Sequence, residues 1–242
     1  MIERPPLLRQ RRELGQIIGT AFGLYTQNFS VLVRIAAMVV PLGVAMGIFQ
    51  TSIKNEALAL GVVAGIGVCQ VGVNLLASAA LLSAFADIEA GRPPDFARAY
   101  DAAFERFWVL LAAVLRVTFH VLLFAITVVG IPWAVQRAVR WIFVAQAVLL
   151  DGTSAKAALT YSADAVTGSW WRTLGIWLLI SIAAALPVAL VSGAFALAPV
   201  AVASTVNAAI DALVLPFVIL ALTLLYFDLQ ARKESHDLAS AA

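Results

Sequence analysis

The sequence has little charge. Only 12% of its 242 residues are Asp, Glu, Lys or Arg, and 62% are hydrophobic, whereas about a quarter of the residues of a typical soluble domain are charged. A soluble domain of this length could not bury so much apolar surface. The formal net charge is only +2, and the basic residues lie between apolar blocks, which argues against a nucleic-acid-binding surface. The composition therefore predicts an integral membrane protein with lipid, and not nucleic acid, as its partner.

The sequence also lacks the residues of common catalytic and metal sites. Cys69 is the single cysteine, so neither a disulfide framework nor a thiolate metal site is expected. There is no glycine loop followed by a phosphate-binding lysine, and no pair of aspartates in the apolar segments suggests an aspartyl protease. We therefore expect no catalytic residue, no cofactor and no metal, and a protein that is not an enzyme.

Six apolar segments are long enough to cross a bilayer, because a hydrocarbon core of about 30 Å needs roughly 20 helical residues. The predicted spans are residues 31–50, 58–85, 107–130, 132–150, 173–197 and 205–228. They indicate an all-α, polytopic membrane helical bundle formed by a single domain, residues 1–242. Only three residues separate the third and fourth spans, and Pro132 suits the first turn of a helix. A tight turn at the far membrane face is the simplest interpretation, and a re-entrant hairpin is the alternative.

The distribution of lysine and arginine predicts the orientation of these spans. With the N-terminus in the cytoplasm, the external turns contain only Lys54, whereas the cytoplasmic segments contain eleven basic residues. These are Arg4, Arg9, Arg11, Arg12, Arg92, Arg98, Arg106, Lys156, Arg172, Arg232 and Lys233. No apolar core follows the N-terminal charges at once, so a cleavable signal peptide is not expected. We predict that both termini are cytoplasmic.

Three amphipathic segments, residues 14–29, 95–107 and 154–168, each precede an odd-numbered span. Their apolar side chains recur at three- and four-residue spacing, which is typical of helices that lie in the headgroup plane. Short helices packed on the bundle are the alternative. An interfacial helix followed by a transmembrane hairpin would then occur three times in one orientation, as a parallel repeat. The units are residues 14–90, 94–152 and 153–230, with a cytoplasmic tail at 229–242.

Several ionisable side chains fall within the predicted spans, where each is costly and therefore a functional candidate. Arg116 and His120 lie one turn apart, as do Arg137 and Arg140, so the third and fourth spans each present a polar stripe. One hypothesis is an internal cavity in which these four residues bind an anion such as a lipid phosphate, because guanidinium binds phosphate bidentately. The alternative is an internal ion pair from Arg137 or Arg140 to Asp211 that only fixes helix packing.

Three stretches of the sequence carry a family resemblance. They are the run Leu224, Leu225, Tyr226, Phe227, Asp228, Leu229, Gln230, Ala231, Arg232, Lys233 and Glu234 followed by Asp237 and Leu238, the segment from Pro132 to Trp141 leading to Asp151 and Gly152, and Ser162 to Gly168 with Trp170, Trp171 and Arg172. Together they resemble the glycerophosphoryl diester phosphodiesterase membrane domain family and related bacterial six-helix membrane proteins. Gln230 and Ser235 depart from that family's pattern, in which a basic residue and a glycine are usual.

The resemblance implies a membrane module in the bacterial cytoplasmic (inner) membrane. In some relatives a phosphodiesterase barrel is fused to this unit, and since these 242 residues leave no room for it, we expect that activity not to carry over. The tail residues Tyr226, Asp228, Arg232, Lys233 and Glu234 have two interpretations, a stop-transfer anchor or a docking site for a cytoplasmic partner.

We therefore expect a non-catalytic membrane scaffold or regulatory module that contacts membrane lipids and forms a homo-oligomer or binds another membrane protein. The alternative is binding or transport of an anionic lipid, or another amphiphilic anion, through the arginine-lined intramembrane cavity.

Overall fold

The computed structural model describes residues 8–52 and 56–241, and every regular element within these ranges is a helix. The α-helices are α1 (Leu14–Gln27), α2 (Phe29–Ala36), α3 (Val40–Ser52), α4 (Glu56–Glu89), α5 (Phe96–Ala125), α6 (Ile131–Arg140), α7 (Val144–Leu149), α8 (Ala155–Val166), α9 (Trp170–Ala194) and α10 (Val200–Ala241). Two 3₁₀ turns, Ala37–Val39 and Val128–Gly130, join α2 to α3 and α5 to α6. Arg4 and Lys54, which entered the orientation argument, lie outside the described residues.

Within the described residues, six helical segments are long and apolar enough to cross a membrane. They are Phe29–Phe49, Gly61–Glu89, Phe96–Ala125, Val128–Leu149, Trp170–Ala194 and Val200–Ser235. The predicted all-α, multi-pass membrane protein is thereby confirmed.

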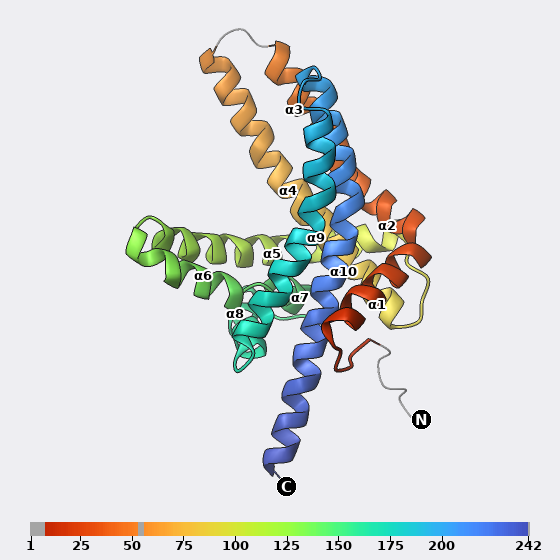
Figure 1. Ribbon diagram of the computed structural model, residues 1–242, viewed down its shortest axis with the longest axis vertical. Helices are drawn as coiled ribbons and strands as arrows, with labels where there is room; N and C mark the ends of the chain where they lie inside the picture. The colour runs from red at the N-terminus through yellow and green to blue at the C-terminus, as the bar shows by residue number, and fades with distance from the viewer. Residues whose placement is uncertain (1–7, 53–55, 242) are drawn as a thin grey trace.

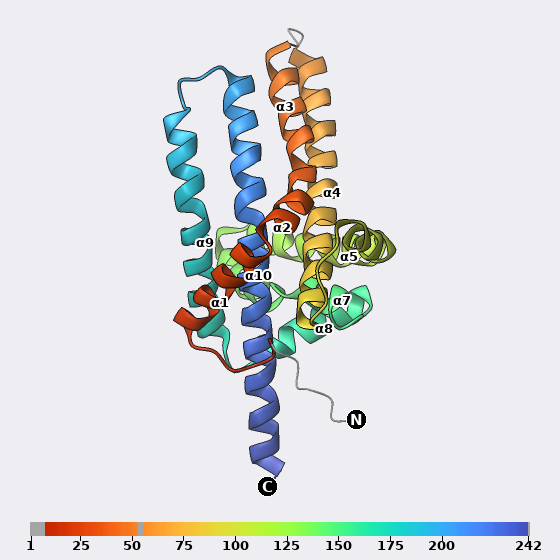
Figure 2. The same cartoon turned by 90° about the vertical axis from the view of Figure 1, so that its right-hand side faces the viewer.

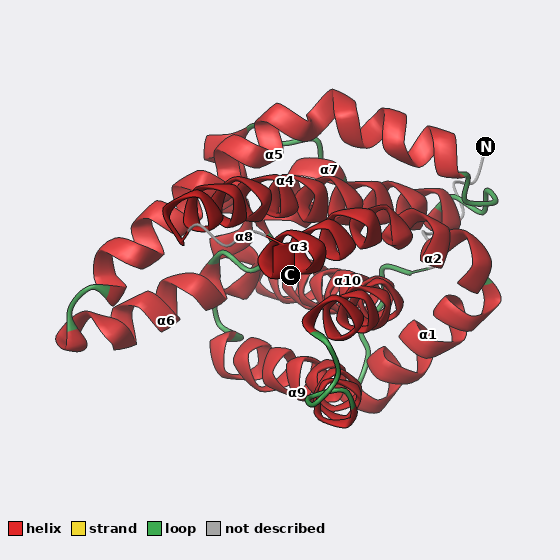
Figure 3. Ribbon diagram, turned by 90° about the horizontal axis from the view of Figure 1, so that it is seen from above, coloured by secondary structure: helices red, strands yellow, loops and turns green. Residues whose placement is uncertain are grey.

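Two hairpins, α3–α4 and α9–α10, stand along the long axis of the molecule (Figure 1; Figure 2). From above, α4, α3, α10 and α9 follow one another across the molecule (Figure 3), so α10 is the helix that joins the two hairpins. Small residues let α3 approach α10 closely. A Cβ atom added at Gly43 would lie 2.6 Å from the Cβ atom of Ala208, so only glycine fits there without a shift.

The second predicted hairpin has a different direction from the other two. Helices α5 and α6 form a hairpin, but it runs crosswise to α4, α9 and α10 instead of beside them (Figure 1; Figure 2). The corner between α4 and α5 sets this direction, because the buried carboxylate of Asp87 binds Arg92 at 2.7 Å and Arg98 at 2.9 Å. The second unit thus departs from the predicted like-oriented repeat.

Two of the three predicted amphipathic helices exist as separate helices. Helix α1 ends before Asn28, and α8 begins after Ser154, whose side chain accepts a hydrogen bond from the Ala157 N–H. The third segment, residues 95–107, is instead continuous with the following span in α5. An N-cap at Asp95 starts this single helix, and no residue in its interior breaks it.

The predicted fourth span is two helices and not one. Helix α6 ends at Arg140 and α7 begins at Val144. Ser162 of α8 stabilises the interruption between the two helices. Its hydroxyl donates to the Arg140 carbonyl at 2.8 Å and accepts from the Phe143 N–H at 3.1 Å. Because a buried side chain satisfies these backbone groups, the helix can end there at little energetic cost.

We call the end of the molecule formed by residues 8–13, the end of α4, α7, α8, the start of α9 and the part of α10 after Leu220 the base. Its core is aromatic. The rings of Phe143 and Tyr226 lie 5.4 Å apart, and Phe227 and Phe85 are also buried. The predicted tail is not a separate segment, because α10 continues through the base as one helix to Ala241.

Candidate functional site

The base contains a buried network of charges centred on Asp228, whose side chain has no solvent exposure. Its carboxylate accepts hydrogen bonds from Arg172 of α9 at 2.8 Å and from Arg232 of α10 at 2.9 Å. The backbone N–H of Arg12 donates to the same carboxylate at 2.7 Å. The Arg12 carbonyl in turn accepts from Arg172 at 2.8 Å and from Arg232 at 3.2 Å. Asp228 thus joins the N-terminal segment, α9 and α10.

The Arg12 side chain is itself buried, with 8% of its surface exposed. Burial lowers the pKa of its guanidinium group, and the nearby Asp228 carboxylate opposes this with a smaller upward effect. Arg12 also donates to the carbonyl of Leu8. The N-terminal segment is therefore held on the base by backbone and side-chain groups together.

A second carboxylate in the base, Asp151, follows α7. It accepts hydrogen bonds from the Tyr226 hydroxyl and from the Gln230 amide, the latter at 3.4 Å. Arg9 lies 3.8 Å from Asp151 and 3.1 Å from Glu89, so the N-terminal segment contacts this group too. Tyr226 and Asp228 are consequently committed to contacts inside the molecule, which removes them from the predicted docking site for a partner.

The last two residues of the predicted tail motif are exposed. Lys233 and Glu234 line a cavity of about 310 Å³ together with Arg9, Asp151 and Gln230. Acidic and basic side chains are mixed in this cavity, so it favours no one ligand charge.

The four candidate residues on the third and fourth spans do not surround one internal cavity. Arg116 and His120 are exposed on α5. The His120 ring instead bonds the Arg116 carbonyl at 2.7 Å and lies 5.6 Å from the Trp141 ring. Arg137 stacks over Trp141, with 5.2 Å between the guanidinium carbon and the ring centre. His120, Arg137 and Trp141 thus form a cluster of a guanidinium group and aromatic rings on the hairpin.

Arg140 lies in a different place, at the end of α6 where the turn between α8 and α9 packs. It lines a cavity of about 260 Å³ with Gln136, Thr167, Gly168 and Trp170. Within the described residues the Arg140 guanidinium has no hydrogen-bonded or ion-paired partner, and the Trp170 indole N–H is buried without an acceptor. The unpaired Arg140 guanidinium therefore lines this cavity next to the Trp170 side chain, whose own N–H is buried; we call it the α6–α9 cavity.

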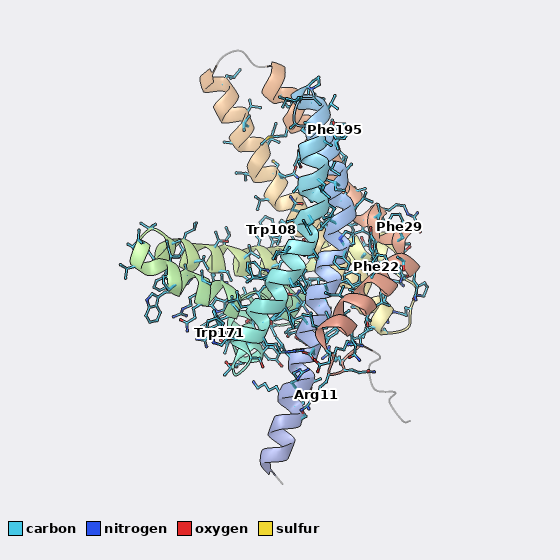
Figure 4. The ribbon with its side chains drawn as sticks, in the orientation of Figure 1. Arg11, Phe22, Phe29, Trp108, Trp171 and Phe195 are labelled. Atoms are coloured by element: carbon cyan, nitrogen blue, oxygen red, sulfur yellow. The ribbon has the colours of Figure 1, made fainter. Side chains whose placement is uncertain are left out.

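The exposed aromatic side chains lie at different heights along the long axis of the molecule. Trp171, 79% exposed, lies toward the base, Phe22, Phe29 and Trp108 lie near the middle of the long axis, Phe195 lies near the far ends of the long hairpins, and Arg11 lies below Trp171 on the base side (Figure 4). Aromatic residues gather at the two membrane–water interfaces. The α6–α9 cavity is lined by Trp170, which is the chain neighbour of the exposed Trp171.

Asp211 does not pair with the arginines. It lies on α10 and lines a cavity formed with α3 and α4, whereas Arg137 and Arg140 belong to the crosswise hairpin. Among the described residues no ion pair joins Asp211 to either arginine. The alternative prediction, an ion pair that fixes helix packing, is therefore not realised by these residues.

Some residues of the site were not singled out from the sequence. In the sequence Arg12 is only one of the charges that predict the orientation, and Asp151 and Trp170 are only parts of the stretches that carry the family resemblance. Their partners lie far away along the chain, as with Arg12 and Asp228, which are 216 positions apart. No local sequence spacing predicts such distant pairs.

A scan against protein-family models and searches of curated proteins and of solved structures gave no match, so the family resemblance stays a prediction.

Proposed function

We propose that this multi-pass membrane protein is a non-catalytic module that binds the phosphate headgroup of an anionic lipid in the α6–α9 cavity. The observation that carries the proposal is the Arg140 guanidinium, which lines this cavity and has no hydrogen-bonded or ion-paired partner among the described residues. A hydrogen bond from this guanidinium to a charged phosphate oxygen contributes about 1.5–3 kcal/mol.

The groups around this guanidinium suit a phosphate. Guanidinium binds two phosphate oxygens in a fixed geometry, and Gln136 adds amide donors from the preceding turn of α6. The start of α9 supplies backbone N–H groups and the positive end of a helix dipole, and Ser169 caps none of them with its side chain. No acidic side chain lines the cavity among the described residues.

The neighbouring surface adds positive charge. A second cavity of about 270 Å³ lies on the Thr167–Ser169 turn and is lined by Arg232 and Lys233. Anionic lipids concentrate in the cytoplasmic leaflet, where basic side chains at the surface attract them. In the proposal the base faces the cytoplasm of a bacterial inner membrane, in agreement with the lysine and arginine distribution of the sequence.

The test compares lipid bound to Arg140→Gln and to Arg116→Gln, which carry the same charge change. Each protein is purified from membranes in mild detergent, and its bound lipid is identified by native mass spectrometry. Anionic phospholipid should be lost from Arg140→Gln and retained by Arg116→Gln, because Arg116 lines none of the cavities described above. Equal anionic lipid in wild type and Arg140→Gln, with both proteins folded, would contradict the proposal.

A second candidate function is a membrane scaffold, and the crosswise hairpin favours it. The tip of this hairpin is apolar and open, since Ile126, Val128 and Val129 are 79%, 84% and 82% exposed. Exposed apolar patches of this kind mark lipid or protein contacts. In a Cys69→Ala background, Val129→Cys should form disulfide-linked dimers in membranes if copies associate through the tip, while Lys156→Cys on α8 serves as the control. Absence of dimers at Val129→Cys would count against self-association through the tip.

A further inference from the structure

The long hairpins form a polar cavity of about 310 Å³ between α3, α4 and α10, and it is open to the surface at Asn74 and Asp211, which are exposed. Five of its nine described lining residues are polar, and they are Gln70, Asn74, Ser204, Asn207 and Asp211. The α6–α9 cavity shares no lining residue with it. We call it the hairpin cavity.

The hairpin cavity lies deep in the membrane. Asp211 is eleven residues into α10 and Gln70 is fourteen residues into α4, which at about 1.5 Å per residue puts both roughly 16–21 Å from the ends of the hairpins. The hydrocarbon core is about 30 Å thick, so these residues lie near its middle. A carboxylate at this depth is costly and is retained where it serves a purpose.

The polar side chains of the hairpin cavity are one carboxylate, three carboxamides and one hydroxyl. Gln70 Oε1 is buried and has no hydrogen-bond partner, and within the described residues Asp211 has no ion-pair partner. The Ser204 hydroxyl donates its proton to the Ala201 carbonyl at 3.1 Å, which leaves its oxygen lone pairs free. Ser192 of α9 donates to Asn207 Oδ1 at 2.8 Å and fixes that carboxamide. No basic residue lines the cavity among the described residues.

We propose that the hairpin cavity binds a monovalent cation, with Asp211 as the charged ligand and the Gln70, Asn74 and Ser204 oxygens as neutral ligands. Hard cations prefer carboxylate, amide and hydroxyl oxygens, and one carboxylate balances one positive charge. At about 310 Å³ the open cavity is larger than a bare monovalent ion needs. It therefore takes the ion with part of its hydration shell. This inference does not rest on the proposed lipid binding.

The test measures thermal unfolding of the full-length protein in nanodiscs of zwitterionic lipid. Binding of anionic lipid then cannot contribute to the measured Tm. NaCl, KCl or choline chloride replaces N-methylglucamine chloride at constant ionic strength. A cation that binds only the folded state raises Tm, by about 5–10 °C when it is about 100-fold above its Kd. A saturable rise with Na⁺ or K⁺ identifies an alkali ion, and a rise with choline alone identifies an organic ammonium ion.

Two variants and a control connect this rise to the cavity. Asp211→Asn should abolish the cation-dependent rise, and Gln70→Leu should raise the half-saturating concentration at least several-fold. Asp164→Asn, which removes an exposed carboxylate from α8, should respond as wild type does. Equal Tm in all monovalent salts, a rise with Ca²⁺ or Mg²⁺ only, or an undiminished rise in Asp211→Asn would each overturn the proposal. Gln70→Leu keeps the test decisive if Asp211→Asn does not fold.

Discussion

Replacing Asp228 by asparagine tests whether the buried charge network holds the base together. The variant keeps the shape of the side chain and an oxygen that accepts from the Arg12 N–H, but it removes the negative charge. Arg172 and Arg232, whose side chains are 27% and 31% exposed, then share only the Arg12 carbonyl and a neutral amide. Breaking a buried pair costs about 3–5 kcal/mol. Because both arginines retain some solvent, we expect the lower figure, about 3 kcal/mol.

The assay is the free energy of unfolding in mixed micelles, from the midpoint and slope of an SDS titration. Glu13→Gln is the matched control, because Glu13 lies 3.8 Å from Arg232 but is 80% exposed. An exposed pair contributes about 0–1 kcal/mol. If Asp228→Asn lowered the free energy of unfolding no more than Glu13→Gln, the reasoning on burial would be refuted.

A double variant makes this test stricter. Once Arg232 is replaced by glutamine, the charge of Asp228 has lost one of its two partners, so Asp228→Asn should be less damaging in that background than in wild type. A coupling energy of about 0.5–3 kcal/mol is expected for residues in one network. Strict additivity would mean that the hydrogen bonds between these side chains do not contribute to stability.

Three more substitutions have outcomes that the packing predicts. Gly43→Ala should lower the free energy of unfolding by about 1–3 kcal/mol through overpacking against α10, while Gly61→Ala, whose new Cβ meets no atom within 4 Å, should not lower it. Ser162→Ala should cost about 1–3 kcal/mol, because it leaves two buried backbone groups unpaired at the break between α6 and α7. Burial raises the pKa of Tyr25 above its ordinary value. This residue therefore adds stability below pH 10, and that stability is lost as the pH rises through the folded-state pKa. Tyr25→Phe should flatten the pH dependence of the free energy of unfolding in that alkaline range.

The direction of the second hairpin could not have been predicted from hydropathy. Apolar length decides whether a segment can cross a bilayer, but it carries no information about the angle to its neighbours. That angle depends on the corner at Asp87, which binds Arg92 and Arg98 across two different elements. In the sequence these two arginines served only as charges that indicate membrane orientation.

The existence and type of most elements was predictable, because their signals are local. The break at Asn28 between α1 and the first span, and the separate helix α8, follow from amphipathic spacing and capping residues. The role of Asp228 was not predictable in the same way. The tail motif marked it as important, but its partners Arg172 and Arg12 lie 56 and 216 positions away, so only the folded chain shows that it points inward.

The two proposed sites should act independently, and this can be measured. Arg140 and Asp211 lie on α6 and α10, line cavities without a common residue and have no shared partner among the described residues. Effects of substitutions that share no partner usually add within about 0.3–0.5 kcal/mol. Arg140→Gln should therefore retain the full cation-dependent rise in Tm, and Asp211→Asn should retain its anionic lipid. If either variant lost both properties while still folded, the two sites would be coupled through α10, the helix on which Asp211 lies and to which the base is fixed by Asp228.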